Sequence, residues 1–237
     1  ATTFLSARWE HLIMANYAID PSLLGPYIPR GVELDEFQGK TYISLVGFLF
    51  KATHLFGLPI PFRFEFEEIN LRFYVRRKEG STNKRGVVFI NESVPTPLVA
   101  WLANRLYSEH YTTIPTKHSI HFGATDNHIG YQWKTTNQWN HLNVVAAKAS
   151  LDMQPGSFEE FIFEHYYGYT RQKNGQTQEY RVNHPRWRVH HVKEYSVEAD
   201  FGNLYGNSFA FLNKMAPETV FLAEGSPVTI DWKRTRI

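Results

Sequence analysis

Three polar side chains at alternate positions, Glu68, Asn70 and Arg72, form the pattern in this 237-residue sequence that best suits chemistry on a small molecule. They lie in residues 64–75, FEFEEINLRFYV, where apolar and polar residues alternate as they do in a half-buried β-strand. Successive strand residues point to opposite faces, so the three polar side chains share one face. The other face carries the apolar side chains Ile69, Leu71, Phe73 and Val75.

The polar face of this strand could bind and activate a small anion. Arg72 offers a planar fork of donors that suits a carboxylate, and Glu68 could orient it or exchange a proton. Tyr74 lies on the same face and is a further candidate for ligand contact. If the face points into a cavity, low dielectric shifts pKa values there. The alternative is a solvent-facing ladder with an ion pair two residues apart, although Phe64 and Phe66 on the same face argue against full exposure.

Two other carboxylates, Glu92 and Glu109, are candidates for ligand contact. Glu92 shares its strand face with the apolar residues Val88, Ile90 and Val94, a setting that would raise its pKa. It could equally be the last residue before a loop. Glu109 lies at the end of a predicted helix, where the helix dipole disfavours an anion, so a specific partner or simple exposure would explain it.

The sequence carries no pattern typical of a metal or nucleotide site. None of the 11 histidines shows metal-ligand spacing, because His118 and His121, like the adjacent His190 and His191, point to opposite faces of a strand. The chain has no cysteine, and it lacks the glycine-rich and nucleophile-elbow motifs. We therefore expect no metal and no cofactor.

The elements that must position these residues are mainly strands. Runs of β-formers predict strands over residues 41–50, 64–75, 86–94, 118–123, 128–135, 141–151, 187–199, 219–223 and 228–232. Asn174-Gly175 predicts a hairpin turn between two more. Helices are expected after Thr96-Pro97 and after Ser157, where Glu160 completes a capping box. Turns and short helical pieces are expected over residues 16–29. The fold class is therefore α+β, dominated by one curved, antiparallel sheet.

Composition favours one soluble β-rich domain spanning residues 1–237. Aromatic residues make up 16% of the chain, and they favour pleated surfaces. With 25 Lys and Arg against 23 Asp and Glu, the formal net charge is +2, and the basic residues 76–78 and 84–85 flank a polar turn as solvated hairpin ends do. We expect no nucleic-acid partner. No apolar run approaches the roughly 18 residues that a membrane span needs, so we expect no membrane partner. The absence of cysteine is compatible with a reducing cytoplasm, and we expect a cytoplasmic location.

Several segments taken together resemble a known family. They include NYAIDPSLLGPYIPRGVELDEFQGKTYISLVGF (residues 16–48), FEEINLRFYV (66–75) and VVFINESVPTPLVAWLANRLYSEHYTTIPTK (87–117). Shorter stretches are YYGY (166–169), NHPRW (183–187), LYG (204–206) and AEGS (223–226). Over nearly the whole chain the sequence resembles the YqjF-like proteins, conserved bacterial proteins of the acetoacetate decarboxylase superfamily. The resemblance implies a closed or nearly closed, predominantly antiparallel β-barrel with a few short helices.

Acetoacetate decarboxylase forms a Schiff base on a lysine whose pKa a second, adjacent lysine depresses. The corresponding stretch here is Asn91 to Pro95, a helix, then Pro115-Thr116-Lys117. The resemblance places Thr116 at the nucleophile and Lys117 at the second lysine, and a slip of one residue would place Lys117 at the nucleophile. The Schiff-base lysine pair is therefore not retained. Glu68 resembles the acid or base glutamate of that enzyme.

These observations predict a polar pocket that binds or acts on a small organic acid or carbonyl compound. One hypothesis is an enzyme with decarboxylase-like, lyase or isomerase chemistry that uses Glu68, Arg72 and Lys117. In it Asn70, Tyr74, Glu92, Glu109 and Thr116 contact the substrate. The other hypothesis is a binding module that kept the pocket and lost the chemistry, which Thr116 favours. Exposed strand edges and apolar patches, together with the oligomeric enzymes of the superfamily, predict a homo-oligomer.

Overall fold

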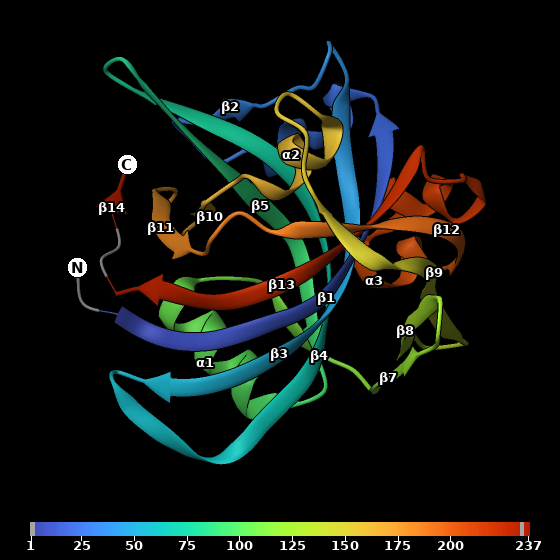
Figure 1. The fold of residues 1–237 in the computed structure, drawn as a ribbon. Helices are drawn as coiled ribbons and strands as arrows, with labels where there is room; N and C mark the ends of the chain where they lie inside the picture. Colours follow the sequence, from blue (N-terminus) through green and yellow to red (C-terminus); the bar gives the residue numbers. More distant parts are fainter. Residues whose placement is uncertain (1–2, 233–234) are drawn as a thin grey trace.

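One curved sheet dominates the computed structural model (Figure 1). The structure describes residues 3–232 and 235–237, except the side chains of residues 61–63, 98, 102, 105 and 106. Its strands are β1 (Thr3–Ile19), β2 (Glu33–Leu34), β3 (Thr41–Leu55), β4 (Leu58–Glu79), β5 (Thr82–Val94), β6 (Tyr111–Thr113), β7 (Thr116–Phe122), β8 (Asp126–Lys134), β9 (Trp139–Asp152), β10 (Tyr167–Arg171), β11 (Thr177–Asn183), β12 (Arg188–Glu198), β13 (Thr219–Asp231) and β14 (Thr235–Arg236). The helices are η1 (Pro21–Tyr27), α1 (Pro97–Tyr107), α2 (Phe158–Phe163), α3 (Phe201–Tyr205) and η2 (Asn207–Lys214). The predicted α+β class, rich in sheet with a few short helices, is confirmed.

The sheet curls until two of its strands meet. Neighbouring strands follow the order β11-β10-β5-β4-β3-β1-β13, and β13 also pairs with β11 through Val182↔Ile230 and Asn183↔Thr229. This pairing makes a ring of strands. Beyond β13 the sheet continues through β12, β9, β8 and β7, which lie to the right in Figure 1. Most pairings are antiparallel, whereas β5 pairs in parallel with β10 and with β6.

The two faces of β4 enter different apolar clusters. Ile69, Leu71, Phe73 and Val75 pack with residues of η1, α3 and η2 on one side of the sheet. Phe66 and Tyr74 pack with Phe48 and with Phe161–Phe163 of α2 on the other side. The alternation of the sequence therefore separates the faces as predicted, because each strand residue reverses the direction of the side chain.

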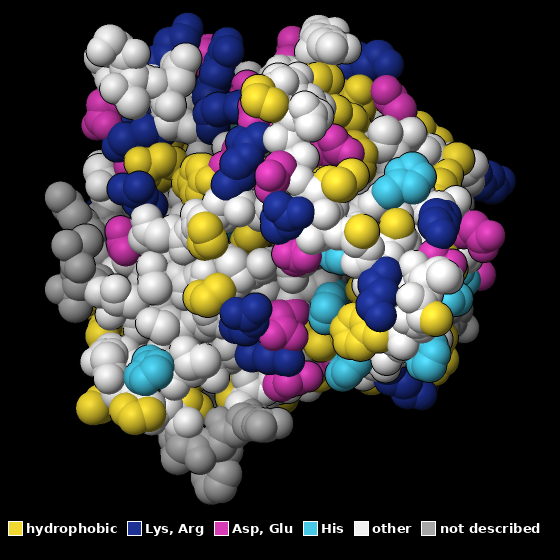
Figure 2. Space-filling model, viewed as in Figure 1, with side chains coloured by type: hydrophobic (Ala, Val, Ile, Leu, Met, Phe, Trp, Pro, Cys, Tyr) yellow, Lys and Arg dark blue, Asp and Glu magenta, His cyan; other side chains and the backbone are white. Residues whose placement is uncertain are grey.

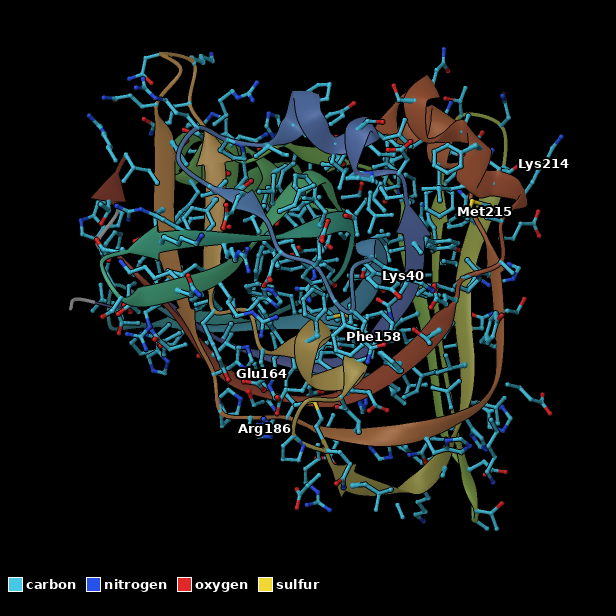
Figure 3. The ribbon with its side chains drawn as sticks, turned by 90° about the horizontal axis from the view of Figure 1, so that it is seen from above. Lys40, Phe158, Glu164, Arg186, Lys214 and Met215 are labelled. Atoms are coloured by element: carbon cyan, nitrogen blue, oxygen red, sulfur yellow. The ribbon has the colours of Figure 1, made fainter. Side chains whose placement is uncertain are left out.

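Two helices pack against the cluster that contains Phe66 and Tyr74, on the side of the sheet that we call the inner face. Ala100 of α1 and Phe161, Ile162 and Phe163 of α2 are buried there. Figure 3, seen from above, shows α2, which begins at the labelled Phe158, and the segment after it that carries Glu164. The predicted cap of α2 is present, since the Ser157 side chain accepts a hydrogen bond from Glu160 N at 3.2 Å. Thr96 makes no such bond, and α1 ends at Tyr107, before the predicted end.

Two strand predictions need correction. The 17-residue β1 was not predicted because polar side chains interrupt its apolar pattern, and its residues 16–19 were wrongly expected to form turns or short helical pieces. It forms because β3 and β13 pair with it on both sides. Residues 219–223 and 228–232 were predicted as two strands, but β13 is continuous from 219 to 231. Gly225 lies within it at φ +83°, and a Cβ there would stand 2.0 Å from Trp9 O, so glycine lets the two strands pass without a break.

The surface mixes charges of both signs. On the face shown in Figure 2, Lys and Arg side chains are interspersed with Asp and Glu, and histidines gather over β7–β9 and β12. Among the described residues, no helix is both long and apolar enough to cross a membrane. The same residues contain no cluster of three or more His, Cys, Asp or Glu that could hold a metal ion.

Candidate functional site

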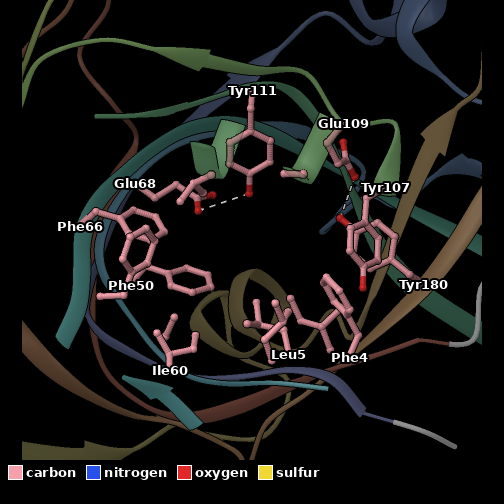
Figure 4. Close-up of a pocket in the computed structure, with 16 residues that line it drawn as sticks. Phe4, Leu5, Phe50, Ile60, Phe66, Glu68, Tyr107, Glu109, Tyr111 and Tyr180 are labelled. Carbon is pink, nitrogen blue, oxygen red and sulfur yellow. Dashed lines mark hydrogen bonds between the residues drawn. The ribbon is translucent and has the colours of Figure 1, made fainter. Parts of the chain in front are cut away.

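Two adjoining cavities lie on the inner face of β4, and we call them the apolar chamber and the polar chamber. The apolar chamber has a volume of about 170 Å³. Figure 4 shows its wall of apolar side chains, among them Phe4, Leu5, Phe50, Ile60 and Phe66. The figure also shows the polar groups that line the chamber, those of Glu68, Glu109, Tyr111 and Tyr180. A cavity of this size and lining would hold a group about as large as benzene.

The polar chamber is smaller, about 80 Å³, and has a different lining. Its polar residues include Glu68, Asn70, Arg72, Glu92, His165 and His184. Glu68, Tyr111 and Tyr180 line both chambers and therefore stand at their boundary. A ligand with an apolar part and a polar head would place the junction between the two parts beside Glu68.

Three buried carboxylates come together at this boundary. Glu68 and Glu92 are each 3% exposed, and Glu109 is 7% exposed. The pairing of β4 with β5 places Asn70 opposite Glu92, and the pairing of β5 with β6 places Tyr111 opposite Glu92. Neighbouring strands therefore bring Glu68, two residues before Asn70, and Glu109, two residues before Tyr111, close to Glu92.

Tyrosine and asparagine side chains orient the carboxylates. Tyr111 OH donates to Glu68 Oε2 at 3.4 Å, and Asn70 Nδ2 donates to Glu68 Oε1 at 3.3 Å. Tyr180 OH donates to Glu109 Oε1 at 2.7 Å, and Figure 4 shows both tyrosine contacts as dashed lines.

Burial makes the carboxylates hold protons near neutral pH. It raises the pKa of Glu68 to about 7 and the pKa of Glu109 to about 7. Burial, together with the nearby charges of Glu109 and Glu68, raises the pKa of Glu92 well above its ordinary value. The cause is the cost of placing a charge in an apolar surrounding, compounded by repulsion between like charges. Such a cluster can both give and accept a proton near pH 7.

Arg72 is the cation of the polar chamber. Its Nη2 donates to Ile162 O at 2.9 Å and contacts Met14 Sδ at 3.3 Å, and its guanidinium lies 5.3 Å from the ring centre of Tyr74. These contacts hold the side chain in place. Its Nε is buried and has no hydrogen-bond partner, so it could donate to a ligand. Tyr74 supports the arginine, while its hydroxyl is 2.7 Å from Ser44 Oγ.

Thr116 and Lys117 lie apart from the three buried carboxylates of Glu68, Glu92 and Glu109. Both lie on β7, and Thr116 Oγ1 donates to Glu67 Oε2 at 2.7 Å. Glu67 neighbours Glu68 in β4 and therefore points to the opposite face. Lys117 is exposed, with Nζ 4.3 Å from the ring centre of Trp139. Neither residue lines a chamber, so this geometry offers no support for a nucleophile at either position.

Sequence reasoning missed Tyr111, Tyr180, His165 and His184. A signal for Tyr180 was present, because the predicted hairpin at Asn174-Gly175 places Gly168 opposite Tyr180. A Cβ on Gly168 would stand 2.1 Å from Tyr180 Cζ. Glycine at 168 therefore makes room for the tyrosine ring that reaches Glu109.

Replacing Gly168 by alanine should force the Tyr180 ring to move and lower the free energy of unfolding by about 1–3 kcal/mol, as overpacking does. Urea denaturation measures the change. Gly25→Ala is the matched control, because nothing lies within 4 Å of a Cβ built there. Equal stabilities of the two variants would contradict the role of Gly168.

Sequence comparison places the chain in a family. It belongs to the DUF2071 family of uncharacterized conserved proteins, whose pattern matches residues 6–227. It is 25% identical over 178 residues to the uncharacterized protein YqjF of Bacillus subtilis, covering 75% of this chain and 72% of that protein. The predicted resemblance to the YqjF-like proteins is confirmed.

Solved structures share the fold. The enduracididine biosynthesis enzyme MppR, in complex with pyruvate, superposes with a TM-score of 0.67 at 11% identity, covering 100% of this chain and 91% of that one. An acetoacetate decarboxylase-like enzyme of Sphingomonas wittichii gives a TM-score of 0.65 at 11% identity, covering 100% and 94%. At such low identity the likeness shows a common fold, that of the acetoacetate decarboxylase-like enzymes.

Proposed function

We propose that the chain binds a small organic acid or carbonyl compound in the two chambers and moves a proton at the carbon next to its carbonyl group. In this proposal the ring of strands is a closed barrel whose interior holds the chambers. The observation that carries it is the position of Glu68, a buried carboxyl that titrates near neutral pH at the boundary of an apolar and a polar cavity. The pyruvate bound by MppR is a compound of the proposed class.

The reaction is an enolisation. Ionised Glu68 takes a proton from the carbon beside the carbonyl, and the C–H electrons form a carbon–carbon double bond. The carbonyl oxygen becomes an enol oxygen and takes its proton from a neutral acid, Glu92 or Tyr111. Arg72 holds a carboxylate of the substrate through its unpaired Nε. Return of the proton to the same or a neighbouring carbon completes an exchange or an isomerisation.

The proposed chemistry needs no imine. No lysine is among the described residues that line either chamber. Proton transfer between the substrate and the buried carboxyls replaces the Schiff-base route, and protonated Glu68 could protonate the carbon left by loss of carbon dioxide. The exposed position of Lys117 also favours the second candidate function, a binding module without catalysis.

The test incubates the protein in D₂O with a panel of 2-keto acids, 3-keto acids and simple ketones and follows loss of the α-proton signal by NMR. We expect exchange above the buffer rate for at least one compound, and no protein adduct after borohydride reduction. Binding without exchange would support the binding module. The absence of both would contradict the pocket proposal itself, and a borohydride adduct would restore a lysine route. The homo-oligomer and the cytoplasmic location stay predictions.

A further inference from the structure

Asp35 holds a histidine at the polar chamber in one orientation and one tautomer. His165 follows α2, and its side chain is fully buried. Its Nε2 lies 2.9 Å from Asp35 Oδ2, which also accepts from Arg85 Nε at 2.7 Å. Although burial opposes ionisation, hydrogen bonds from His165 and Arg85 bring the pKa of Asp35 below its ordinary value. Asp35 is therefore an acceptor, and the ring proton lies on Nε2.

This tautomer leaves His165 Nδ1 with a free lone pair. Nδ1 is buried and has no hydrogen-bond partner. Burial lowers the pKa of His165 to about 4, so the ring stays neutral near pH 7. The rings of Tyr74 and Phe161, with centroids 4.9 and 5.1 Å away, fix its plane. His165 therefore acts as a rigid, neutral acceptor in the wall of the polar chamber.

A second histidine of this chamber is also neutral. His184 Nδ1 donates to Pro185 O at 2.8 Å, and its ring stacks on Trp187 at 3.9 Å. Burial lowers its pKa to about 4, which leaves Nε2 as an acceptor.

The unsatisfied atoms of the chamber describe the group that would fill it. Arg72 Nε and Trp9 Nε1 are buried donors without partners, whereas Asn70 Oδ1, Glu92 Oε2 and His165 Nδ1 are buried atoms without partners that could accept. Leaving such groups unpaired costs free energy, so an occupant should satisfy both kinds at once. A head group that only accepts would pair with Arg72 and leave the acceptors facing its own lone pairs.

We propose that His165, positioned by Asp35, determines specificity by accepting a hydrogen bond from a hydroxyl of the ligand, beside an oxygen that accepts from Arg72 Nε. The ligand class is a carboxylic acid with a hydroxyl on the adjacent carbon and an apolar substituent for the apolar chamber. This inference rests on the proposed function in one respect, that ligands enter the two chambers. It assigns His165 and Asp35 a part that the proton-transfer proposal does not use.

Two probes that differ by one hydroxyl test this: 2-hydroxy-3-phenylpropionate and 3-phenylpropionate, whose phenyl ring suits the apolar chamber. By calorimetry, we expect the hydroxylated probe to bind about tenfold or more tightly, because the second probe leaves His165 Nδ1 unpaired. In His165→Phe the ratio of the two dissociation constants should fall to within about twofold of one. The exposed His191→Phe should keep the wild-type ratio.

A measurement on the wild-type protein guards against a variant that fails to fold. The ¹⁵N resonance of His165 Nδ1 should shift when the hydroxylated probe binds and stay in place with 3-phenylpropionate. Equal affinities of the wild type for the two probes would overturn the inference and leave the proposed function standing. The same holds if His165→Phe loses affinity for both probes equally and the ¹⁵N resonance does not shift in the wild type. Failure of both probes to bind at millimolar concentration would contradict ligand entry into the chambers, and the proposed function with it.

Discussion

Replacing Glu68 by glutamine is expected to lower the rate of α-proton exchange in a bound carbonyl compound by about 100-fold or more. Glutamine keeps the shape of the side chain, and its oxygen can accept from Asn70 while its NH2 group donates to the Tyr111 hydroxyl, but an amide does not take up a proton near pH 7. General acid–base catalysis by a positioned side chain contributes about 10²–10⁴-fold. Deuterium incorporation followed by NMR measures the rate, and calorimetry shows whether the ligand still binds.

The matched control is Glu65→Gln. Glu65 lies in the same strand and is exposed, and its Oε2 is 3.6 Å from Lys51 Nζ. We expect its exchange rate to equal that of the wild type. An unchanged rate in Glu68→Gln would remove Glu68 from the reaction, and an equal loss in both variants would point to a general effect of charge.

The second large effect concerns pH and stability. A carboxyl whose pKa is higher in the folded than in the unfolded protein stabilises the fold most at low pH, and this contribution is lost as the pH rises through the folded pKa. For Glu68, with a folded pKa of about 7 against an ordinary value of 4.5, the loss between pH 5 and pH 8 is on the order of 2–3 kcal/mol. Glutamine at this position does not titrate. The free energy of unfolding of Glu68→Gln should therefore rise relative to the wild type by that amount over this range.

The difference between the two proteins is the useful measurement, because other groups titrate as well. Because the pKa values of His165 and His184 are lowered in the folded protein, these two residues raise the free energy of unfolding as the pH increases from about 4 to 6.5. In that range they offset the loss of stability that the carboxyls cause. Above pH 6.5 this offset ends, and the wild type itself should lose stability. Urea denaturation at pH 5, 6, 7 and 8 gives the curves, with Glu65→Gln parallel to the wild type. A constant gap between Glu68→Gln and the wild type would show that Glu68 is ionised throughout.

Local patterns in the sequence predicted much of what lies within one or two strands. The alternation over residues 64–75 placed Glu68, Asn70 and Arg72 on the face that lines the polar chamber, because strand geometry alone sets the direction of alternate side chains. The capping box at Ser157 and Glu160 predicted the start of α2, since its hydrogen bonds join residues three apart. The turn at Asn174-Gly175 predicted the pairing of β10 with β11 for the same reason.

Contacts between distant segments could not be predicted in this way. Glu109 meets Tyr180 across 71 residues, and Asp35 meets His165 across 130. The first contact depends on the pairing of β5 with β10, and the second depends also on the pairing of β2 with β4. No local pattern in these strands specifies either pairing. Burial of the carboxylates, and with it their raised pKa values, also depends on the packing of the whole ring.

The sequence by itself therefore determined which side chains share a strand face, where several turns and helices begin, and the family to which the chain belongs. The tertiary structure alone decided that Glu68, Glu92 and Glu109 lie together in an apolar surrounding and that Lys117 lies outside it. The physical reason is one of range. Side-chain direction and capping follow from bonds between near neighbours in the sequence. The contacts and the protonation state of a buried group depend on all the strands that enclose it.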